Sequence, residues 1–384
     1  MKLPSVRPAE PLLAEEARRL SAQAADILPQ EAFHRMITIE RKRTERSRKP
    51  FLLMLLDTGN DLPTDKNSRL LVDLLNALAT STRETDVTGW YATGAVVGVM
   101  YTEIAPCDRS SIVATMLARV SNALRENLGL EQFHRVKLSF HLFPEDWNHD
   151  DPGRPSNPTL YPDLNERDDS HKHLRTIKRT MDIVGSSLAL LMLAPLLVLI
   201  AAAIKATSKG PVFFKQKRVG QHGECFTFLK FRSMYVNNDS SQHKQYVRQL
   251  IAGQAAKSPS SDPNGGVFKL TNDPRITRVG RFLRRTSLDE LPQFLNVLIG
   301  EMSLVGPRPA IPYEVEAYDI WHRRRVLEAK PGITGLWQVQ GRSRVGFDEM
   351  VRLDLRYVRC WSPWLDLKIL LQTPKAVVDG TGAY

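Results

Sequence analysis

Cysteine is scarce in this chain. Its 384 residues include only Cys107, Cys225 and Cys360, which lie far apart and form no CxxC pair. An odd number of isolated cysteines argues against a disulfide framework and a zinc site, so we expect free thiols in a reducing compartment. His171 and His173 lack cysteine or acidic partners at metal-binding spacing and are interpreted as linker residues.

The usual nucleotide-binding loops are missing as well. Neither GxGxxG nor GxxxxGK[ST] occurs in the sequence, which argues against Rossmann and P-loop sites. We also expect no secretory signal peptide, because residues 1–30 mix acids and bases around a pattern of alanine and leucine. That pattern predicts an amphipathic helix.

Acidic residues are sparse in the second half only. Residues 1–170 contain 21 Lys and Arg against 25 Asp and Glu, a net charge of −4. Residues 171–384 contain 32 against 17, a net charge of +15. This asymmetry predicts that one half faces an anionic partner, which is a nucleic acid, a membrane surface or a phosphorylated substrate.

Residues 31–145 have the pattern of an α/β domain. Apolar or alternating runs predict strands, and apolar residues at helical spacing predict helices between them. The predicted strands are 51–57, 95–101 and 136–143, and the predicted helices are 69–86 and 110–128. Residues 146–172, rich in Pro, Asp and Asn, predict a linker to a second domain over 173–384.

A run of 22 residues without a charge, 183–204, follows this linker. A hydrocarbon core of about 30 Å needs about 20 helical residues, so the length permits a full span. Pro195 lies at its centre, where it removes a backbone hydrogen bond and kinks the helix. Basic residues flank both ends and do not select an orientation. We favour a re-entrant helix over about 178–205 that is kinked at Pro195, with a full span and a buried soluble helix as alternatives.

The segment after the membrane helix is strongly basic. Residues 210–234 predict short strands and turns, and 235–267 predict a loop that covers a site. Within 273–302, apolar and arginine residues alternate at helical spacing, as in a helix on an anionic lipid surface. The alternative is a surface helix packed on the core. The apolar residues are Ile276, Val279, Phe282 and Leu283, and the arginines are Arg275, Arg278, Arg281, Arg284 and Arg285.

Asp289 and Glu290 lie in the stretch RRTSLDELPQ, residues 284–293. Ser287 and Glu290 have the spacing of a capping box, which is the structural interpretation. That box would place Pro292 at a helix-interior position that needs a backbone N–H. A new helix beginning near Pro292 avoids the conflict and leaves both carboxylates at its positive end, where ionised forms are favoured. An ionised aspartate suits a metal ligand or a nucleophile toward phosphorus.

Basic residues that suit phosphates surround this pair in the sequence. Lys230 and Arg232 lie in KFRSM, Arg308 in the turn GPRP, and Arg342 at the end of KPGITGLWQVQGR. Arginine clamps phosphates with two hydrogen bonds, and Mg²⁺ on a carboxylate neutralises a diphosphate. No single one of these residues identifies a phosphate-binding site.

Taken together, these motifs resemble the bacterial sugar transferases, also called polyprenyl-phosphate hexose-1-phosphate transferases or monotopic phosphoglycosyl transferases. The resemblance runs from about Lys178 to Tyr384. Its motifs are KRTMDIVGS, GPVFFKQKRVG, KFRSM, RRTSLDELPQFLNVLIGEMSLVGPRP, KPGITGLWQVQGR and DLRYVRCWSPWLDLKILLQT. The implied fold is a re-entrant helix, amphipathic surface helices and a small α/β catalytic core on the cytoplasmic face of the bacterial inner membrane.

The resemblance also implies a reaction. A sugar-1-phosphate moves from a UDP-sugar to undecaprenyl phosphate, and UMP is released. Asp289 matches the nucleophile that forms a phosphosugar-aspartyl intermediate, Glu290 completes the dyad, and Mg²⁺ is expected at Asp289. Family positions that hold the phosphates or the uridine correspond to Lys230, Arg284, Arg308 and Arg342. Cys360 departs from the expected asparagine, at a position we interpret as structural.

Residues 31–145 resemble a degenerate diguanylate cyclase (GGDEF) domain. Asp57 ends a strand like that family's metal aspartate, and Arg83 and Asp86 match an RxxD motif for inhibitory cyclic-di-GMP. The signature position reads ATGAV at 92–96, so the catalytic acids are absent and we expect no cyclase activity. Cyclic-di-GMP binding at Arg83 and Asp86 is one hypothesis, and a structural or dimerising domain is the other.

Two other functions compete with the transferase. A membrane-anchored regulatory or scaffold protein that senses a nucleotide through its N-terminal domain is the main alternative. The intact Asp289–Glu290 pair argues against it. A nucleic-acid binder is disfavoured, because the basic residues coincide with apolar stripes and a lipid-length segment. The sugar is not specified by the motifs, and UDP-glucose or UDP-galactose is the first expectation. A homodimer formed through either half of the chain is compatible with the sequence.

Overall fold

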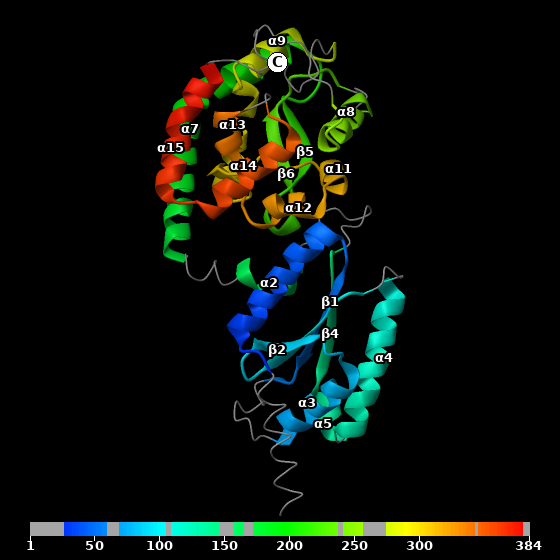
Figure 1. Ribbon diagram of the computed structural model, residues 1–384. Coiled ribbons are helices and arrows are strands. Elements are labelled where there is room, and N and C mark those ends of the chain that lie inside the picture. The colour runs from blue at the N-terminus through cyan, green and yellow to red at the C-terminus, as the bar shows by residue number, and fades with distance from the viewer. Residues whose placement is uncertain are drawn as a thin grey trace, which may run out of the picture. The chain divides into compact units, whose positions relative to one another are not determined.

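The computed structural model describes residues 27–59, 69–104, 109–128, 130–145, 157–164, 172–236, 241–255, 274–341 and 345–378 (Figure 1). The chain divides into two compact units. The first comprises residues 1–145 and 157–167, and the second comprises 146–156 and 168–384. Most of the helix predicted over 1–30 lies outside the described residues.

The N-terminal unit is built on an antiparallel sheet with strand order β2-β3-β1-β4. The strands are β1 (Phe51–Asp57), β2 (Val87–Ala92), β3 (Val96–Tyr101) and β4 (Lys137–Phe143), and the helices are α2 (Gln30–Ser47), α3 (Arg69–Ser81), α4 (Arg109–Asn127) and α5 (Leu130–Arg135). The α/β prediction for 31–145 is confirmed. A strand over 87–92 was missed, because its residues are only partly buried and end in the polar tip of a hairpin.

Each face of this sheet is covered by helices (Figure 1). On one face, Leu52 and Met54 of β1 form a fully buried core with Leu74 of α3 and other apolar residues of α3 and α4. On the other face, Phe33 of α2 lies against the backbone of Gly98, where a Cβ atom would be 2.3 Å from the ring. A glycine there is required by close packing.

Part of the predicted linker 146–172 is folded onto the N-terminal unit. Its described residues 157–164 begin with a 3₁₀ turn, η2 (Pro158–Leu160). Arg41 of α2 pairs with Asp163 and stacks over the ring of Tyr161. The polar residues of this segment therefore include a partly buried ion-pair partner, Asp163, which composition alone does not distinguish from a solvated residue.

The second unit contains two small sheets. One is the antiparallel hairpin of β5 (Phe213–Val219) and β6 (Cys225–Phe231), and the other is the parallel pair β7 (Ser303–Val305) and β8 (Gly332–Thr334). The helices are α7 (Lys172–Thr207), α8 (Ser241–Ile251), α9 (Arg278–Arg285), α10 (Gln293–Ile299), α11 (Pro312–Glu316), α12 (Ile320–Leu327), α13 (Leu336–Gln340), α14 (Phe347–Arg359) and α15 (Pro363–Val378). A core of Phe226, Val297, Val305 and Tyr357 joins both sheets to α10 and α14.

Helix α7 carries the apolar run. Of the described residues, it alone forms a helix long and apolar enough to cross a membrane, and only 11% of its most apolar window is buried. Leu191 and Met192 are more than 70% exposed. The helix continues through Pro195 without the reversal expected of a hairpin-like re-entrant turn. A proline removes one helical hydrogen bond, and flanking bonds can carry the helix past it.

The N-terminal third of α7 is fixed to the same unit by polar contacts. Lys178 Nζ lies 2.6 Å from Asp366 Oδ2 of α15, and Figure 1 shows these two helices side by side. Arg179 donates 2.7 Å and 2.8 Å hydrogen bonds to the last carbonyls of α10. Asp182 accepts hydrogen bonds from Ser303 Oγ and the backbone N–H of Leu304 at the start of β7.

The C-terminal end of α7 is fixed as well. Arg232, just after β6, donates hydrogen bonds to the carbonyls of Ser208 and Lys209 at 2.8 Å and 2.7 Å. Ile200 and Ile204 pack with Phe231 in a buried cluster. Both ends of α7 are thus bonded to the rest of the second unit.

Candidate active site

Asp289 and Glu290 lie in a single 3₁₀ turn, η4 (Leu288–Glu290), between α9 and α10. Ser287 before them is left-handed, with φ of 58°, and makes no side-chain cap bond, so the capping box does not form. Helix α10 begins at Gln293, directly after Pro292, as the second interpretation predicted. A non-glycine residue at positive φ costs roughly 1 kcal/mol, which the surrounding packing must offset.

Asn296 locks the helix after the carboxylates onto the strand that carries Lys230. It is 1% exposed. Its Oδ1 accepts a 3.1 Å hydrogen bond from the Leu229 N–H, and its Nδ2 donates a 2.8 Å bond to the Thr227 carbonyl. The sequence analysis missed Asn296, because a polar residue inside a short helix gives no signal until its partners are known.

Lys230 stands on β6 among charged groups of both signs. Its ammonium lies 5.2 Å from the centre of the Phe214 ring on β5. Burial lowers the pKa of Lys230 to about 8, the charge of Asp289 opposes that shift, and Arg218 and Arg284 reinforce it. Lys230 thus lies within electrostatic reach of Asp289 and Arg284.

Glu290 and Asp289 differ in exposure. Asp289 is only 7% exposed, whereas the Glu290 residue is open to solvent on one side. Protein atoms crowded around the carboxyl group raise the pKa of Glu290, and the neighbouring Asp289 charge raises it further. Arg308 and Lys230 oppose this rise. The pair therefore combines a buried Asp289 residue with a Glu290 carboxyl group of reduced acidity, a suitable division between a nucleophile and a proton-handling group.

Arg308 projects from the rigid turn Gly306–Pro309 between β7 and α11. Gly332 lies so close to this turn that a Cβ atom there would be 2.0 Å from the Gly306 nitrogen. Two prolines in four residues fix the backbone dihedral angles and remove two donors. Arg308 lowers the pKa of Glu290, so the electrostatic field of its guanidinium reaches the carboxylates.

Arg218 is a member of the site that sequence analysis missed. It lies on β5 and is 4% exposed. Its Nη1 donates a 2.8 Å hydrogen bond to the Pro309 carbonyl, and its guanidinium stacks over Phe228 at 4.9 Å. Burial, reinforced by the charge of Arg308, lowers the pKa of Arg218 to about 10. In the sequence, only its position in the KQKRVG motif pointed to a role for Arg218 in the site.

Other predicted residues fall elsewhere. Arg232 binds the end of α7, and it is not a phosphate ligand in this arrangement. Arg342 lies outside the described residues. On α9, Leu283 packs into the core, as expected of a packed surface helix, whereas Phe282 is 59% exposed, and contact of this helix with a lipid surface stays a prediction.

Arg83 and Asp86 form a local turn in the N-terminal unit. Asp86 Oδ2 accepts a 2.8 Å hydrogen bond from the Arg83 backbone N–H, and the Asp86 N–H donates to the Arg83 carbonyl. The carboxylate already has a structural role in this turn. Asp57 likewise accepts a hydrogen bond from the Gly59 N–H.

The site residues fit a magnesium ion that is shared with a substrate. The described part of the chain contains no group of three or more His, Cys, Asp or Glu side chains that would enclose a metal. Mg²⁺ instead commonly takes one or two carboxylates and completes its shell with water and phosphate oxygens. Asp289 and Glu290 supply such a pair, next to cationic groups that attract a diphosphate.

Comparison with known proteins matches the second unit to one family. The family model for bacterial sugar transferases matches residues 173–380. Galactosyl transferase CpsE of Streptococcus agalactiae is 45% identical over 207 residues, which are 54% of this chain and 43% of CpsE. Undecaprenyl-phosphate galactose phosphotransferase of Salmonella typhimurium is 45% identical over 212 residues, 55% of this chain and 42% of that protein. The chain therefore spans less than half the length of either relative.

A shorter relative is matched over most of its length. Exopolysaccharide production protein ExoY of Rhizobium meliloti is 40% identical over 210 residues, 54% of this chain and 88% of ExoY. Among solved structures, a DGC protein from Thermotoga maritima matches 32% of this chain and 87% of that protein, with 13% identity and a TM-score of 0.26. The likeness of the N-terminal unit to a GGDEF domain remains a resemblance.

Proposed function

The chain belongs to the bacterial sugar transferase family, and we propose that it transfers a hexose-1-phosphate from a UDP-sugar to undecaprenyl phosphate, with release of UMP. One observation carries this proposal. The enclosed Asp289 carboxylate shares its electrostatic environment with Glu290, Lys230 and arginines from three other segments. Such a set of groups suits two successive displacements at phosphorus.

In the first displacement, an Asp289 carboxylate oxygen attacks the phosphorus that bears the sugar. A bond forms between this oxygen and phosphorus, and the bond to the UMP oxygen breaks. Lys230, Arg308 and Arg284 stabilise the phosphate oxygens, whose negative charge spreads in the transition state. A phosphosugar-aspartyl intermediate remains on the protein.

In the second displacement, the phosphate of the lipid acceptor attacks the same phosphorus and restores the Asp289 carboxylate. Glu290, whose pKa is raised, is suited to hold the acceptor or to exchange a proton with it. A bound Mg²⁺ would supply charge neutralisation for the diphosphate of the donor.

Helix α7 supports a monotopic arrangement on the cytoplasmic face of the inner membrane. Lys178 near one end and the carbonyl of Lys209 just past the other end are both bonded to the second unit. A helix that crossed the bilayer would have to place these contacts on opposite sides. Exposed Leu191 and Met192 lie between the anchors, so this middle part is the surface suited to acyl chains.

Lipid-dependent UMP release by detergent-purified full-length protein tests the proposal. The panel contains UDP-galactose, UDP-glucose and other UDP-sugars, with undecaprenyl phosphate and Mg²⁺. We expect turnover with at least one donor, and a loss of about 10³-fold or more for Asp289→Asn, because an amide is not a nucleophile toward phosphorus.

The matched control is Glu349→Gln, which neutralises an exposed carboxylate on α14. We expect near-normal rates from it. Equal rates from Asp289→Asn and wild type would remove Asp289 from the mechanism. No turnover with any donor would favour the alternative of a membrane-anchored regulatory or scaffold protein.

A further inference from the structure

Each carbonyl of residues 307–309 accepts a hydrogen bond from a different part of the second unit. The Pro307 carbonyl accepts from the Gly332 N–H at 2.8 Å, and the Pro309 carbonyl accepts from Arg218 at 2.8 Å. The Arg308 carbonyl accepts a 3.1 Å bond from Arg325 Nη2. The turn is therefore held at three consecutive points, although its two prolines already restrict it.

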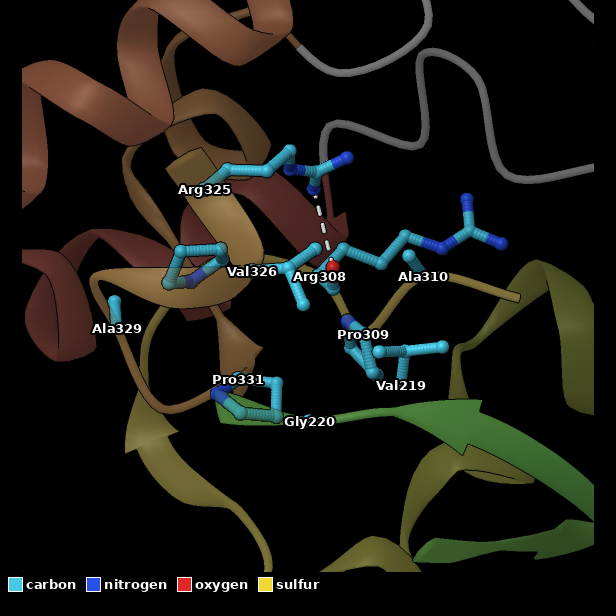
Figure 2. A pocket seen from close by; sticks show the side chains of 10 residues that line it. Val219, Gly220, Arg308, Pro309, Ala310, Arg325, Val326, Ala329 and Pro331 are labelled. Carbon is cyan, nitrogen blue, oxygen red and sulfur yellow. Dashed lines mark hydrogen bonds between the residues drawn. The ribbon is translucent and has the colours of Figure 1, made fainter. Parts of the chain in front are cut away.

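Arg325 differs from the other two donors because it reaches the turn from a helix, whereas Gly332 and Arg218 lie on strands. It lies on α12 and is 3% exposed. Figure 2 shows its guanidinium directed at the Arg308 carbonyl, beside a pocket lined by Pro309, Val326 and Pro331, while the Arg308 side chain extends away from that carbonyl. Arg325 thus contacts the base of Arg308 and leaves its guanidinium free to face a substrate.

Other buried groups hold Arg325 in place. Its Nη2 lies 2.8 Å from Asp354 Oδ2 on α14, a residue that is 1% exposed. Its Nη1 donates a 3.1 Å hydrogen bond to Tyr318 Oη. Burial raises the pKa of Asp354 to about 6, and Arg325 opposes that rise. A buried ion pair of this kind contributes little net stability relative to apolar packing, so stability alone does not explain it.

We propose that Arg325 is a positioning residue for the transferase reaction, which fixes the backbone of Arg308 so that the Arg308 guanidinium meets the donor phosphates. The proposal rests on the proposed function and extends it to a residue outside the phosphate-binding set. Displacement of a charged group by about 1 Å is sufficient to reduce a rate by roughly 100-fold.

A double-mutant cycle separates positioning from general stability. The four proteins are wild type, Arg325→Met, Arg308→Ala and the double variant, each full-length in detergent. We expect kcat/KM to fall about 30-fold for Arg325→Met and about 100-fold for Arg308→Ala. If Arg325 acts through Arg308, kcat/KM of the double variant is also reduced about 100-fold relative to wild type. A reduction of kcat/KM by about 3,000-fold in the double variant, the product of the two single losses, would overturn the proposal.

Two further variants control for folding and charge. Arg324→Met removes a neighbouring arginine of α12 that pairs with Glu328, and we expect it to keep the wild-type rate. Arg325→Lys retains the charge but cannot reach both the Tyr318 hydroxyl and the Arg308 carbonyl, so we expect an intermediate rate. A melting temperature for Arg325→Met far below that of Arg325→Lys, with equal rates, would assign Arg325 to stability instead.

Affinity for UDP provides a readout that does not require turnover. We expect Arg325→Met to weaken UDP binding in calorimetry when Arg308 is present, and to change it less than twofold in the Arg308→Ala background. An equal loss in both backgrounds would overturn the positioning role. Wild type that binds UDP but transfers no sugar would instead contradict the proposed function.

Discussion

We expect the lowered pKa of Lys230 to make the proposed transferase activity fall at alkaline pH. A free lysine with a pKa of 10.5 stays protonated through pH 9, but burial lowers the pKa of Lys230 to about 8. With that value, about 90% of Lys230 is charged at pH 7 and about 10% at pH 9. If the charged form binds the donor phosphates, kcat/KM decreases about tenfold between pH 7 and pH 9.

Replacement by arginine tests the origin of this decrease. Arginine has an ordinary pKa about two units above that of lysine, so Lys230→Arg is expected to move the alkaline limb to a higher pH, although its absolute rate falls because the guanidinium is larger. The assay is UMP release at subsaturating donor from pH 6.5 to 10, since kcat/KM reports groups of the free enzyme. A wild-type profile that stays flat to pH 10, or the same limb in both proteins, would refute the assignment to Lys230.

Two other predictions concern Asn296 and the N-terminal unit. Asn296→Leu leaves the Leu229 N–H and the Thr227 carbonyl without partners, so we expect a stability loss of about 2–4 kcal/mol. Thermal denaturation measures it, with Asn127→Ala, a change at an exposed residue of α4, as the control. An unchanged melting temperature for Asn296→Leu would contradict the role of Asn296. Asp86 is engaged in a turn, so we expect no binding of cyclic-di-GMP at this motif. In calorimetry of the full chain with cyclic-di-GMP, wild type and Arg83→Ala should therefore give the same heat. Heat that disappears in that variant would establish the ligand.

Long motifs and strong periodicity made much of this fold predictable. The run 183–204 predicts a helix because 22 uncharged residues leave few alternatives. Pro292 also marks the start of α10, because proline fits a first turn and no later position. These features depend on neighbours in the chain, which a single sequence displays.

Arg218, which the sequence analysis missed, and Arg232, which it grouped with phosphate-binding residues, both depend on partners distant in the sequence. Arg218 binds a carbonyl 91 residues away, and Arg232 binds the end of α7 about 24 residues before it. In the sequence, Arg218 and Arg232 lie in basic motifs, just as Lys230 and Arg308 do. Only tertiary contacts separate an arginine that fixes backbone from one whose guanidinium remains available for phosphate.

The polar base of α7 connects the membrane helix to both halves of the site. Arg179 binds the end of α10, the helix that follows the carboxylates, and Asp182 binds the start of β7, the strand that precedes Arg308. A shift of α7 would therefore act on the Asp289 segment and on the Arg308 turn together. If the acceptor is a lipid, as we propose, the site must lie at a fixed depth relative to the bilayer. The polar contacts of Arg179 and Asp182 on α7 are suited to set that depth.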